Sequence, residues 1–245
     1  MGINIDKDSA TSYILRLDKK KVTPSILSDI CCSHVLLVEG EDDRFFFEHL
    51  IKHIYEDTSN SEILTETVQF FISKGKTRFK ELIKSIAKTK NSSNIRKLAL
   101  IRDIDNEDVD SDLLPKLKSY FTDIDEIDFT LPLDNPTEFP SGAVSVGFFF
   151  LPDNKSSGKL ETLCLQAIKN DPKYVDINRC IKAFLECASE LNITLDLEKT
   201  EVKAFCSLFA DIRYIGGAVQ RNLINFNSEV FQELKEFTLK FLEKH

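Results

Sequence analysis

The stretch HVLLVEGEDD, residues 34–43, decides the fold of this chain. It begins with a short apolar run, residues 34–38, that stops at Glu39, and Gly40 then lets the backbone turn. Three acidic residues follow, and apolar side chains then recur at the spacing of a helix. The pattern predicts a buried strand, a tight turn and a helix over residues 42–55.

Two later apolar runs also end in carboxylates: KLALIRDID, residues 97–105, and VGFFFLPD, residues 146–153. Strand patterns alternate with helix patterns around them. The further predicted elements are a strand over 68–73, a helix over 76–88, a strand over 97–102, a short helix over 112–120 and a strand over 143–151. This alternation predicts an α/β fold with a parallel sheet flanked by helices, in which the carboxyl ends of the strands meet at one edge.

After Gly158 only helix patterns remain. They cover residues 160–169, 177–191, 198–209 and 228–243, with breaks expected at 170–172 and at Gly216 and Gly217. We expect one compact unit with three parts. These are an N-terminal extension over 1–33 with an amphipathic stretch at 13–27, an α/β core over 34–155, and a helical C-terminal part over 156–245 packed on the core. The segment 123–145 holds three prolines and is expected to be irregular, as a lid or substrate surface.

The spacing of the carboxylates indicates a site for a hard divalent cation, which prefers oxygen ligands. Asp103 and Asp105 are two residues apart, so in a strand both point the same way, about 7 Å apart. Glu39 and Asp43 can converge across the strand-to-helix turn. Three carboxylates crowded at a sheet edge repel one another unless a cation or an arginine offsets them.

Some of these acidic residues also have a purely structural interpretation. Acidic side chains are favoured in the first turn of a helix, so Glu41 and Asp42 are equally well explained as helix caps. Asp153 is either a further ligand or the start of a turn.

A basic run follows the second predicted strand. Lys74, Lys76 and Arg78 fall in a turn at the same sheet edge, where they could contact a phosphate. A lysine-rich, solvent-facing helix surface explains the run equally well. The sequence Gly75-Lys76-Thr77 lacks the GxxxxGK[ST] spacing of a nucleotide-binding loop, so we do not assign ATP binding to it.

Two motifs together resemble the TOPRIM domain, the fold shared by topoisomerases, bacterial primases, small ribonucleases and OLD-family (overcoming lysogenization defect) nucleases. They are VEGEDD, residues 38–43, and RDID, residues 102–105. An acidic residue four positions after the first, Asp43 after Glu39, is more similar to the OLD-type nucleases. The stretch over 148–163 resembles small stand-alone TOPRIM proteins related to effectors of bacterial anti-phage systems. The resemblance spans residues 35–210.

This resemblance implies a metal-dependent nuclease that hydrolyses phosphodiester bonds in DNA or RNA, as an anti-phage effector. It implies that Glu39, Asp43, Asp103 and Asp105 bind one or two Mg²⁺ or Mn²⁺ ions, with Glu161 as a further acidic member. Lys203 resembles the lysine that such nucleases place near the scissile phosphate. Related effectors often depend on a partner that restrains or triggers them.

Two other classes of function stay open. One is a non-catalytic, metal-binding regulatory module that partners an ATPase. The other is a phosphatase or a nucleotidyl transferase on a similar sheet, but a phosphatase with an aspartate nucleophile expects its DxD on the first strand, and here it follows the third. The sequence leaves open DNA against tRNA or other RNA as substrate, one or two metals, activity alone or with a partner, and homo-oligomer formation.

Composition and charge limit the kinds of partner, location and metal site that we expect for this chain. The net charge of −8 and the pI near 5.2 argue against a protein that holds long nucleic acid by charge alone. No apolar run approaches the roughly 20 residues that span a bilayer, and the first residues carry no hydrophobic signal region, so we expect a cytoplasmic protein. The six cysteines show no CxxC spacing and are expected to be reduced. His49 and His53 lack the glutamate of a zinc-binding HExxH motif.

Overall fold

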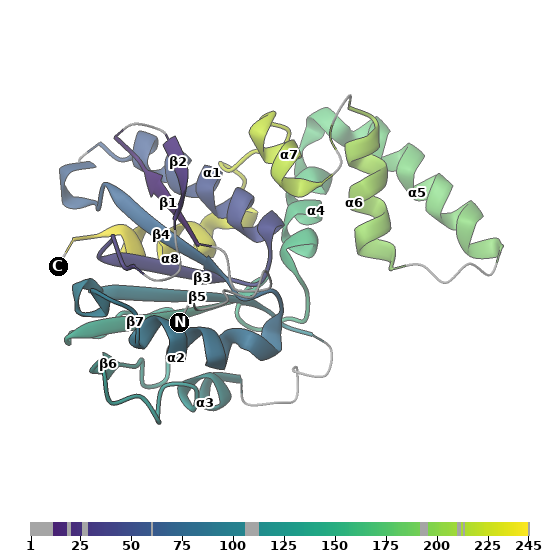
Figure 1. The fold of residues 1–245 in the computed structure, drawn as a ribbon. Coiled ribbons are helices and arrows are strands. Elements are labelled where there is room, and N and C mark those ends of the chain that lie inside the picture. Colours follow the sequence, from purple (N-terminus) through teal and green to yellow (C-terminus); the bar gives the residue numbers. More distant parts are fainter. Residues whose placement is uncertain are drawn as a thin grey trace, which may run out of the picture.

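A computed structural model describes residues 12–18, 21–25, 29–59, 61–105, 113–191, 196–209, 212 and 214–244. Within these ranges the chain forms a seven-stranded sheet in the order β2-β1-β4-β3-β5-β7-β6, with helices on both faces (Figure 1). The predicted α/β fold is therefore confirmed. The strands are β1 Ser12–Arg16, β2 Lys21–Ser25, β3 His34–Val38, β4 Thr67–Ile72, β5 Lys97–Asp103, β6 Phe129–Thr130 and β7 Val144–Leu151.

The core of the sheet is parallel. β3 pairs in parallel with β4 and β5, and β7 pairs in parallel with β5 and β6. β1 is antiparallel to both β2 and β4, so the N-terminal segment adds two strands to the sheet. The sequence predicted only an amphipathic stretch there. Because β1 pairs with β4, it supplies hydrogen-bond partners to backbone groups that an edge strand would leave unpaired.

Helices cover the sheet on two sides, and each side has its own hydrophobic core. Leu36 and Val38 of β3 pack with the helices on one side, whereas Val35 and Leu37 pack with those on the other. A strand buried on both faces reads as a continuous apolar run, which is why the sequence revealed β3, β5 and β7 clearly. The first core takes buried side chains from α1 Glu41–Asp57, α4 Leu160–Asn170, α6 Leu197–Ser207, α7 Ile215–Gln220 and α8 Gln232–Leu242. The second core takes them from α2 Phe79–Ala87 and α3 Leu113–Lys118.

The order of the strands places a topological switch point at the centre of the sheet. From β3 the chain passes through α1 to β4 on one side, and from β4 it passes through α2 to β5 on the other side of β3. Because α1 and α2 lie on opposite faces, the connections diverge beyond the carboxyl ends of β3 and β5. Ligands of open α/β sheets bind at such a switch point.

The four helices predicted after residue 158 are present as α4, α5 Val175–Glu190, α6 and α8. The break predicted at Gly216 and Gly217 is wrong, because both glycines lie inside α7. A Cβ on Gly216 would lie 2.6 Å from the Cβ of Phe45, so this glycine lets α7 approach α1 closely. None of the helices over the described ranges combines the length and the apolar character that a bilayer crossing requires.

The segment expected to be an irregular loop lies against the outer edge of β7. It contains the two-residue strand β6, and the Pro136 carbonyl accepts a hydrogen bond from the backbone N–H of Phe148 at 2.7 Å. Phe139 packs against the Phe237 ring of α8, with ring centroids 5.3 Å apart. The described contacts of this segment are therefore those of an edge cover for the sheet.

Candidate functional site

The candidate site lies where β3 and β5 end. The backbone N–H of Asp103, the last residue of β5, donates a hydrogen bond to Glu39 Oε1 at 3.3 Å. Glu39 directly follows β3, so this bond joins the ends of the two central strands at the switch point. Burial raises the pKa of Glu39, while the Asp103 N–H and the positive charge of Arg102 act in the opposite direction.

Asp43 reaches the same place from the first turn of α1. Its Oδ2 accepts a hydrogen bond from the backbone N–H of Gly40 at 2.8 Å, so it has the structural role of a helix cap. Burial, together with the charges of Glu39 and Glu161, raises its pKa to about 7, although the Gly40 hydrogen bond opposes this shift. A carboxylate that only capped a helix in water would have a pKa near or below 4.

Asp103 lies beside the start of α4, where the Leu160 backbone donates a hydrogen bond to it. A short backbone bridge between Ile104 and Gly158, with N···O distances of 2.8 and 3.1 Å, holds this helix against the end of β5. Burial and the charges of Asp43, Glu39 and Glu161 raise the pKa of Asp103 to about 8, against a hydrogen bond from the Leu160 backbone. Gly158 has a φ of +157°, and a Cβ there would lie 2.8 Å from the hydroxyl of Thr162, so the bridge requires glycine.

Asp105 belongs to a neighbouring group. Its Oδ2 accepts from Lys76 Nζ at 2.6 Å, and Lys76 opens the short turn Lys76–Arg78 that leads into α2. Gly75 precedes this turn with a φ of +123°, which glycine tolerates and other residues rarely adopt. Asp105 and Lys76 both act on the pKa of Glu39, in opposite directions, so Glu39 lies between the two groups.

The five residues predicted as metal ligands lie close enough for their charges to act on one another, and we call them the carboxylate cluster: Glu39, Asp43, Asp103, Asp105 and Glu161. The grouping differs in detail from the predicted one. The sequence paired Asp103 with Asp105, whereas the charges that raise the pKa of Asp103 come first from Asp43, Glu39 and Glu161. The reason is that Asp105 follows the end of β5, and its side chain is held by Lys76.

The donor chemistry of the cluster fits a hard divalent cation, since every candidate ligand is a carboxylate. The spacing is not that of a preformed cage. Over the described residues, no three Asp, Glu, His or Cys side chains stand close enough together to hold a metal ion. Asp43 and Asp103 instead receive hydrogen bonds from backbone N–H groups of Gly40 and Leu160.

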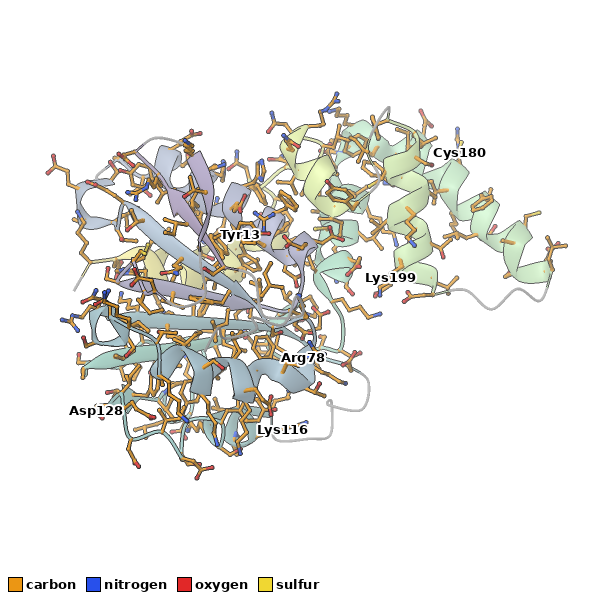
Figure 2. All side chains as sticks on the ribbon, in the orientation of Figure 1. Tyr13, Arg78, Lys116, Asp128, Cys180 and Lys199 are labelled. Atoms are coloured by element: carbon orange, nitrogen blue, oxygen red, sulfur yellow. The ribbon has the colours of Figure 1, made fainter. Side chains whose placement is uncertain are left out.

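Of the three basic residues predicted to contact phosphate, Lys76 lies in the site. Lys74 and Arg78 are exposed on either side of it in the sequence, and Figure 2 shows Arg78 near the end of the sheet. Further along the run, Lys80 and Lys84 each lie 3.8 Å from Asp123, so part of the predicted basic surface is neutralised within the chain.

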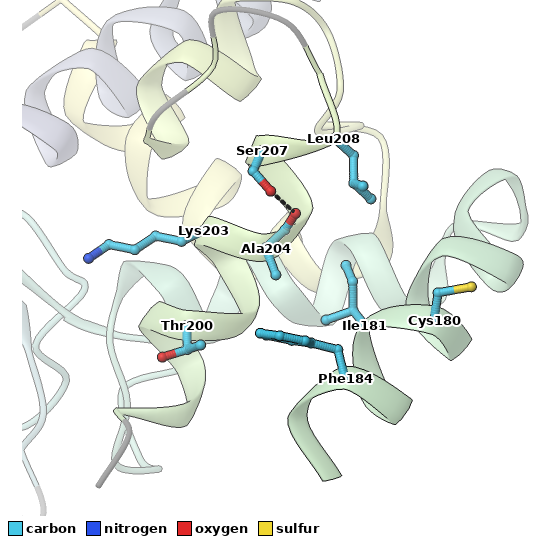
Figure 3. Close-up of a pocket in the computed structure, with 8 residues that line it drawn as sticks. All are labelled: Cys180, Ile181, Phe184, Thr200, Lys203, Ala204, Ser207 and Leu208. Atoms are coloured by element: carbon cyan, nitrogen blue, oxygen red, sulfur yellow. Dashed lines mark hydrogen bonds between the residues drawn. The ribbon is translucent and has the colours of Figure 1, made fainter. Parts of the chain in front are cut away.

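Lys203 is exposed on α6, and its side chain points out of the space between α5 and α6 (Figure 3). The helix itself lies near the first turn of α1, because the Asp42 carboxylate adds to the effect of burial that raises the pKa of Cys206 to about 11. Among the described residues, no carboxylate forms an ion pair with Lys203. Its predicted role therefore stays a prediction.

The structure also assigns partners to residues that the sequence left ambiguous. Glu41 accepts from the Tyr13 hydroxyl at 3.0 Å and from Nε of the buried Arg44 at 2.7 Å, which ties it to an ion pair within α1. Asp153 accepts from the N–H groups of Lys155 and Ser156, as the start of a turn. Arg102 is a site residue that sequence reasoning missed. Its charge acts to lower the pKa of Glu39, against the larger effect of burial, and its signal in the sequence is its place beside Asp103 in RDID.

Comparisons with known proteins place this chain in a family without assigning an activity. The family model described as "Protein of unknown function (DUF3226)" matches residues 33–243, so the chain belongs to this family. No curated protein and no solved structure matches it. The matched region contains the whole carboxylate cluster.

Proposed function

We propose that this DUF3226 protein is a metal-dependent nuclease that hydrolyses phosphodiester bonds in DNA or RNA. One observation carries the proposal: carboxylates from the ends of β3 and β5, from α1 and from α4 converge at the switch point of the sheet. The resemblance of VEGEDD and RDID to TOPRIM motifs supports the same activity.

The electrostatics of the cluster support a cation there. Asp43 and Asp103 have pKa values raised to about 7 and about 8, first by burial and then by neighbouring carboxylates. Such crowding is unfavourable unless protons or a positive charge offset it. A divalent ion would replace the protons, and its ligands would then be ionised at neutral pH.

Glu39, Asp43, Asp103 and Glu161 are the residues that would hold Mg²⁺ or Mn²⁺. When bound, such an ion supplies charge stabilisation to a phosphate and an activated water. The ammonium of Lys76, which pairs with Asp105 at 2.6 Å, is placed to orient a substrate phosphate beside the cluster.

The same proposal covers how the chain holds its substrate and what it does in the cell. A chain with a net charge of −8 gains little from long-range attraction to nucleic acid, so we infer that it holds only a short stretch of substrate near the scissile phosphate. We propose a cytoplasmic anti-phage effector, on the resemblance of residues 148–163 to small stand-alone TOPRIM proteins.

The test is cleavage of plasmid, single-stranded DNA and total RNA by the purified chain with Mg²⁺, Mn²⁺ or a chelator. We expect metal-dependent cleavage of at least one substrate. Glu39→Gln and Asp103→Asn should each lower the rate by about a hundredfold or more, because each removes a charged ligand. Asp134→Asn, in the exposed edge loop, is the matched control and should cut like the wild type. Full activity of Glu39→Gln would contradict the assignment.

A second candidate is a non-catalytic, metal-binding regulatory module that partners an ATPase. The observation in its favour is that Asp43 and Asp103 hold backbone N–H groups and do not form a preformed cage. It predicts heat of Mn²⁺ binding in titration calorimetry, lost in Glu39→Gln, without cleavage of any of the three substrates. Cleavage by the wild type that disappears in Glu39→Gln would exclude it.

A further inference from the structure

Two helices, α5 and α6, extend away from the sheet and form what we call the helical arm (Figure 1). Only Ile181 of the 16 residues of α5 is buried. Exposed apolar side chains concentrate on this part of the molecule. Of the eight large apolar side chains that are most exposed over the described ranges, six lie on the arm or just beyond it: Val175, Phe184, Leu191, Leu197, Leu208 and Tyr214.

A groove of about 510 Å³ runs between the two helices. On the α5 side, the Phe184 ring reaches toward α6 but is still 56% exposed. The α6 side offers the small residues Thr200, Ala204 and Ser207 (Figure 3). The Ser207 hydroxyl donates to the Ala204 carbonyl at 2.8 Å, so it is already used within the helix. The groove is therefore an apolar surface with few polar groups to direct a hydrophilic ligand.

The spacing of residues on α5 indicates what kind of partner fits. Ile177, Cys180, Phe184, Cys187 and Leu191 recur at intervals of three and four, which is the seam of a helix that packs on another helix. Phe184, Leu191 and both cysteines of this seam are exposed. The exposed seam therefore fits a second helix whose apolar side chains recur at the same intervals of three and four residues.

We propose that the helical arm binds the arm of a second copy of this chain, with the two α5 helices antiparallel across a two-fold axis near Phe184. In this register Ile177 faces Leu191 of the second copy, and the two Phe184 rings meet at the centre. The same surface of each copy then contributes the exposed apolar side chains of α5 and the small residues of α6. A two-fold interface requires such a self-complementary surface.

Charge favours a second copy over a strongly charged partner. Four of the five charged side chains of α5 form pairs within the helix, Arg179 with Asp176 at 3.0 Å and Lys182 with Glu186 at 3.9 Å. The fifth, Glu190, is the last residue of the helix. The seam itself carries no charged side chain. Two copies therefore meet without like charges between them, although the whole chain carries −8. The inference does not depend on the proposed nuclease activity.

Sedimentation velocity over about a hundredfold range of concentration tests the proposal. The wild-type chain should form a dimer as its concentration rises. Phe184→Asp and Leu208→Asp should each shift it to monomer, while circular dichroism stays unchanged because both side chains are more than half exposed. Leu133→Asp is the matched control: Leu133 is 82% exposed in the edge loop, so its substitution should leave the dimer intact. A wild-type monomer at every concentration overturns the proposal, and so does a dimer that both arm substitutions leave intact.

Cross-linking of native cysteines gives an independent readout. In a Cys31→Ser background, the exposed cysteines over the described residues are Cys180 and Cys187. A short bismaleimide should link Cys180 of one copy to Cys187 of the other, since the antiparallel register places them about one residue apart. Adding Phe184→Asp should abolish the product. Links only between like cysteines indicate parallel helices and overturn the proposed register.

Discussion

Asp103 combines a structural and a proposed chemical role in one side chain. It accepts a hydrogen bond from the Leu160 backbone at the start of α4, and burial and three neighbouring carboxylates raise its pKa to about 8. A residue with only the structural role would be served as well by asparagine. The raised pKa is therefore the property that a substitution can separate from the fold.

The pH dependence of stability follows from these pKa values. In chelator, folded Asp103 and Asp43 keep their protons to about pH 8 and 7, whereas unfolded chains release them near pH 4. The folded state then binds more protons, so the free energy of unfolding should fall as pH rises from about 4 to 8. Asp103→Asn should make this decline shallower, by at most about 1.4 kcal/mol per pH unit, in urea titrations.

Two comparisons make this experiment specific. Asp134→Asn, an exposed carboxylate outside the cluster, should keep the wild-type slope. Mn²⁺ should stabilise the wild type more at pH 8 than at pH 5, because its ligands must be ionised. An unchanged slope in Asp103→Asn would show that this carboxylate is ionised in the folded chain at neutral pH.

At the scale of elements, α7 shows how tertiary packing overrides local preference. Two adjacent glycines disfavour a helix, and the sequence accordingly predicted a break. The helix forms because Gly216 lies against Phe45 of α1, where a side chain would not fit. Burial of Ile215, Ala218 and Val219 in the core on this side of the sheet then stabilises it.

The two glycines should respond oppositely to alanine. Gly216→Ala places a methyl group 2.6 Å from the Phe45 Cβ and should destabilise the chain by about 1–3 kcal/mol. A methyl group on Gly217 would lie 3.5 Å from its nearest neighbour, so Gly217→Ala should stabilise by about 0.5–1 kcal/mol through helix propensity. Urea denaturation of both variants checks this, and equal effects at the two positions would contradict the packing argument.

At the scale of the whole molecule, the C-terminal helix closes the fold. α8 packs against the sheet, and Phe237 contacts the rings of Phe139 and Phe149 at centroid distances of 5.3 and 5.4 Å. At the last residue of the helix, the Leu242 carbonyl accepts from the Thr65 N–H at 2.7 Å. The buried Lys97 of β5 donates to the Lys240 carbonyl at 2.6 Å, at the end of α8. Leu36, near the start of the matched family region, and Leu242, near its end, lie in the same hydrophobic core.

Phe237→Ala should therefore weaken the whole fold and not only the C-terminal helix. We expect a loss of about 3–5 kcal/mol in the free energy of unfolding, because the ring is buried between the sheet and the edge loop. The unfolding transition should stay cooperative when tryptic digestion and circular dichroism are compared. Leu133→Ala is the control and should change stability by less than about 0.5 kcal/mol. Selective release of α8 alone would contradict a shared core.

The sequence by itself determined the α/β class, the central strands and most of the helices. It could do so because a strand buried on both faces and an amphipathic helix leave distinct apolar periods. It also located the carboxylates at the strand ends, since alternation and parallel connections require those ends to meet at one edge.

Only the tertiary structure decided which carboxylates face one another and which partner each one has. Asp105 is held by Lys76, which lies in the connection between β4 and α2; Glu41 accepts from Tyr13 of β1; and the bridge at Gly158 brings the start of α4 to the end of β5. The pairing of β1 with β4 and the helix at Gly216 were decided in the same way. These contacts join residues far apart in the chain, and their free energy depends on burial and close approach, which no local period encodes.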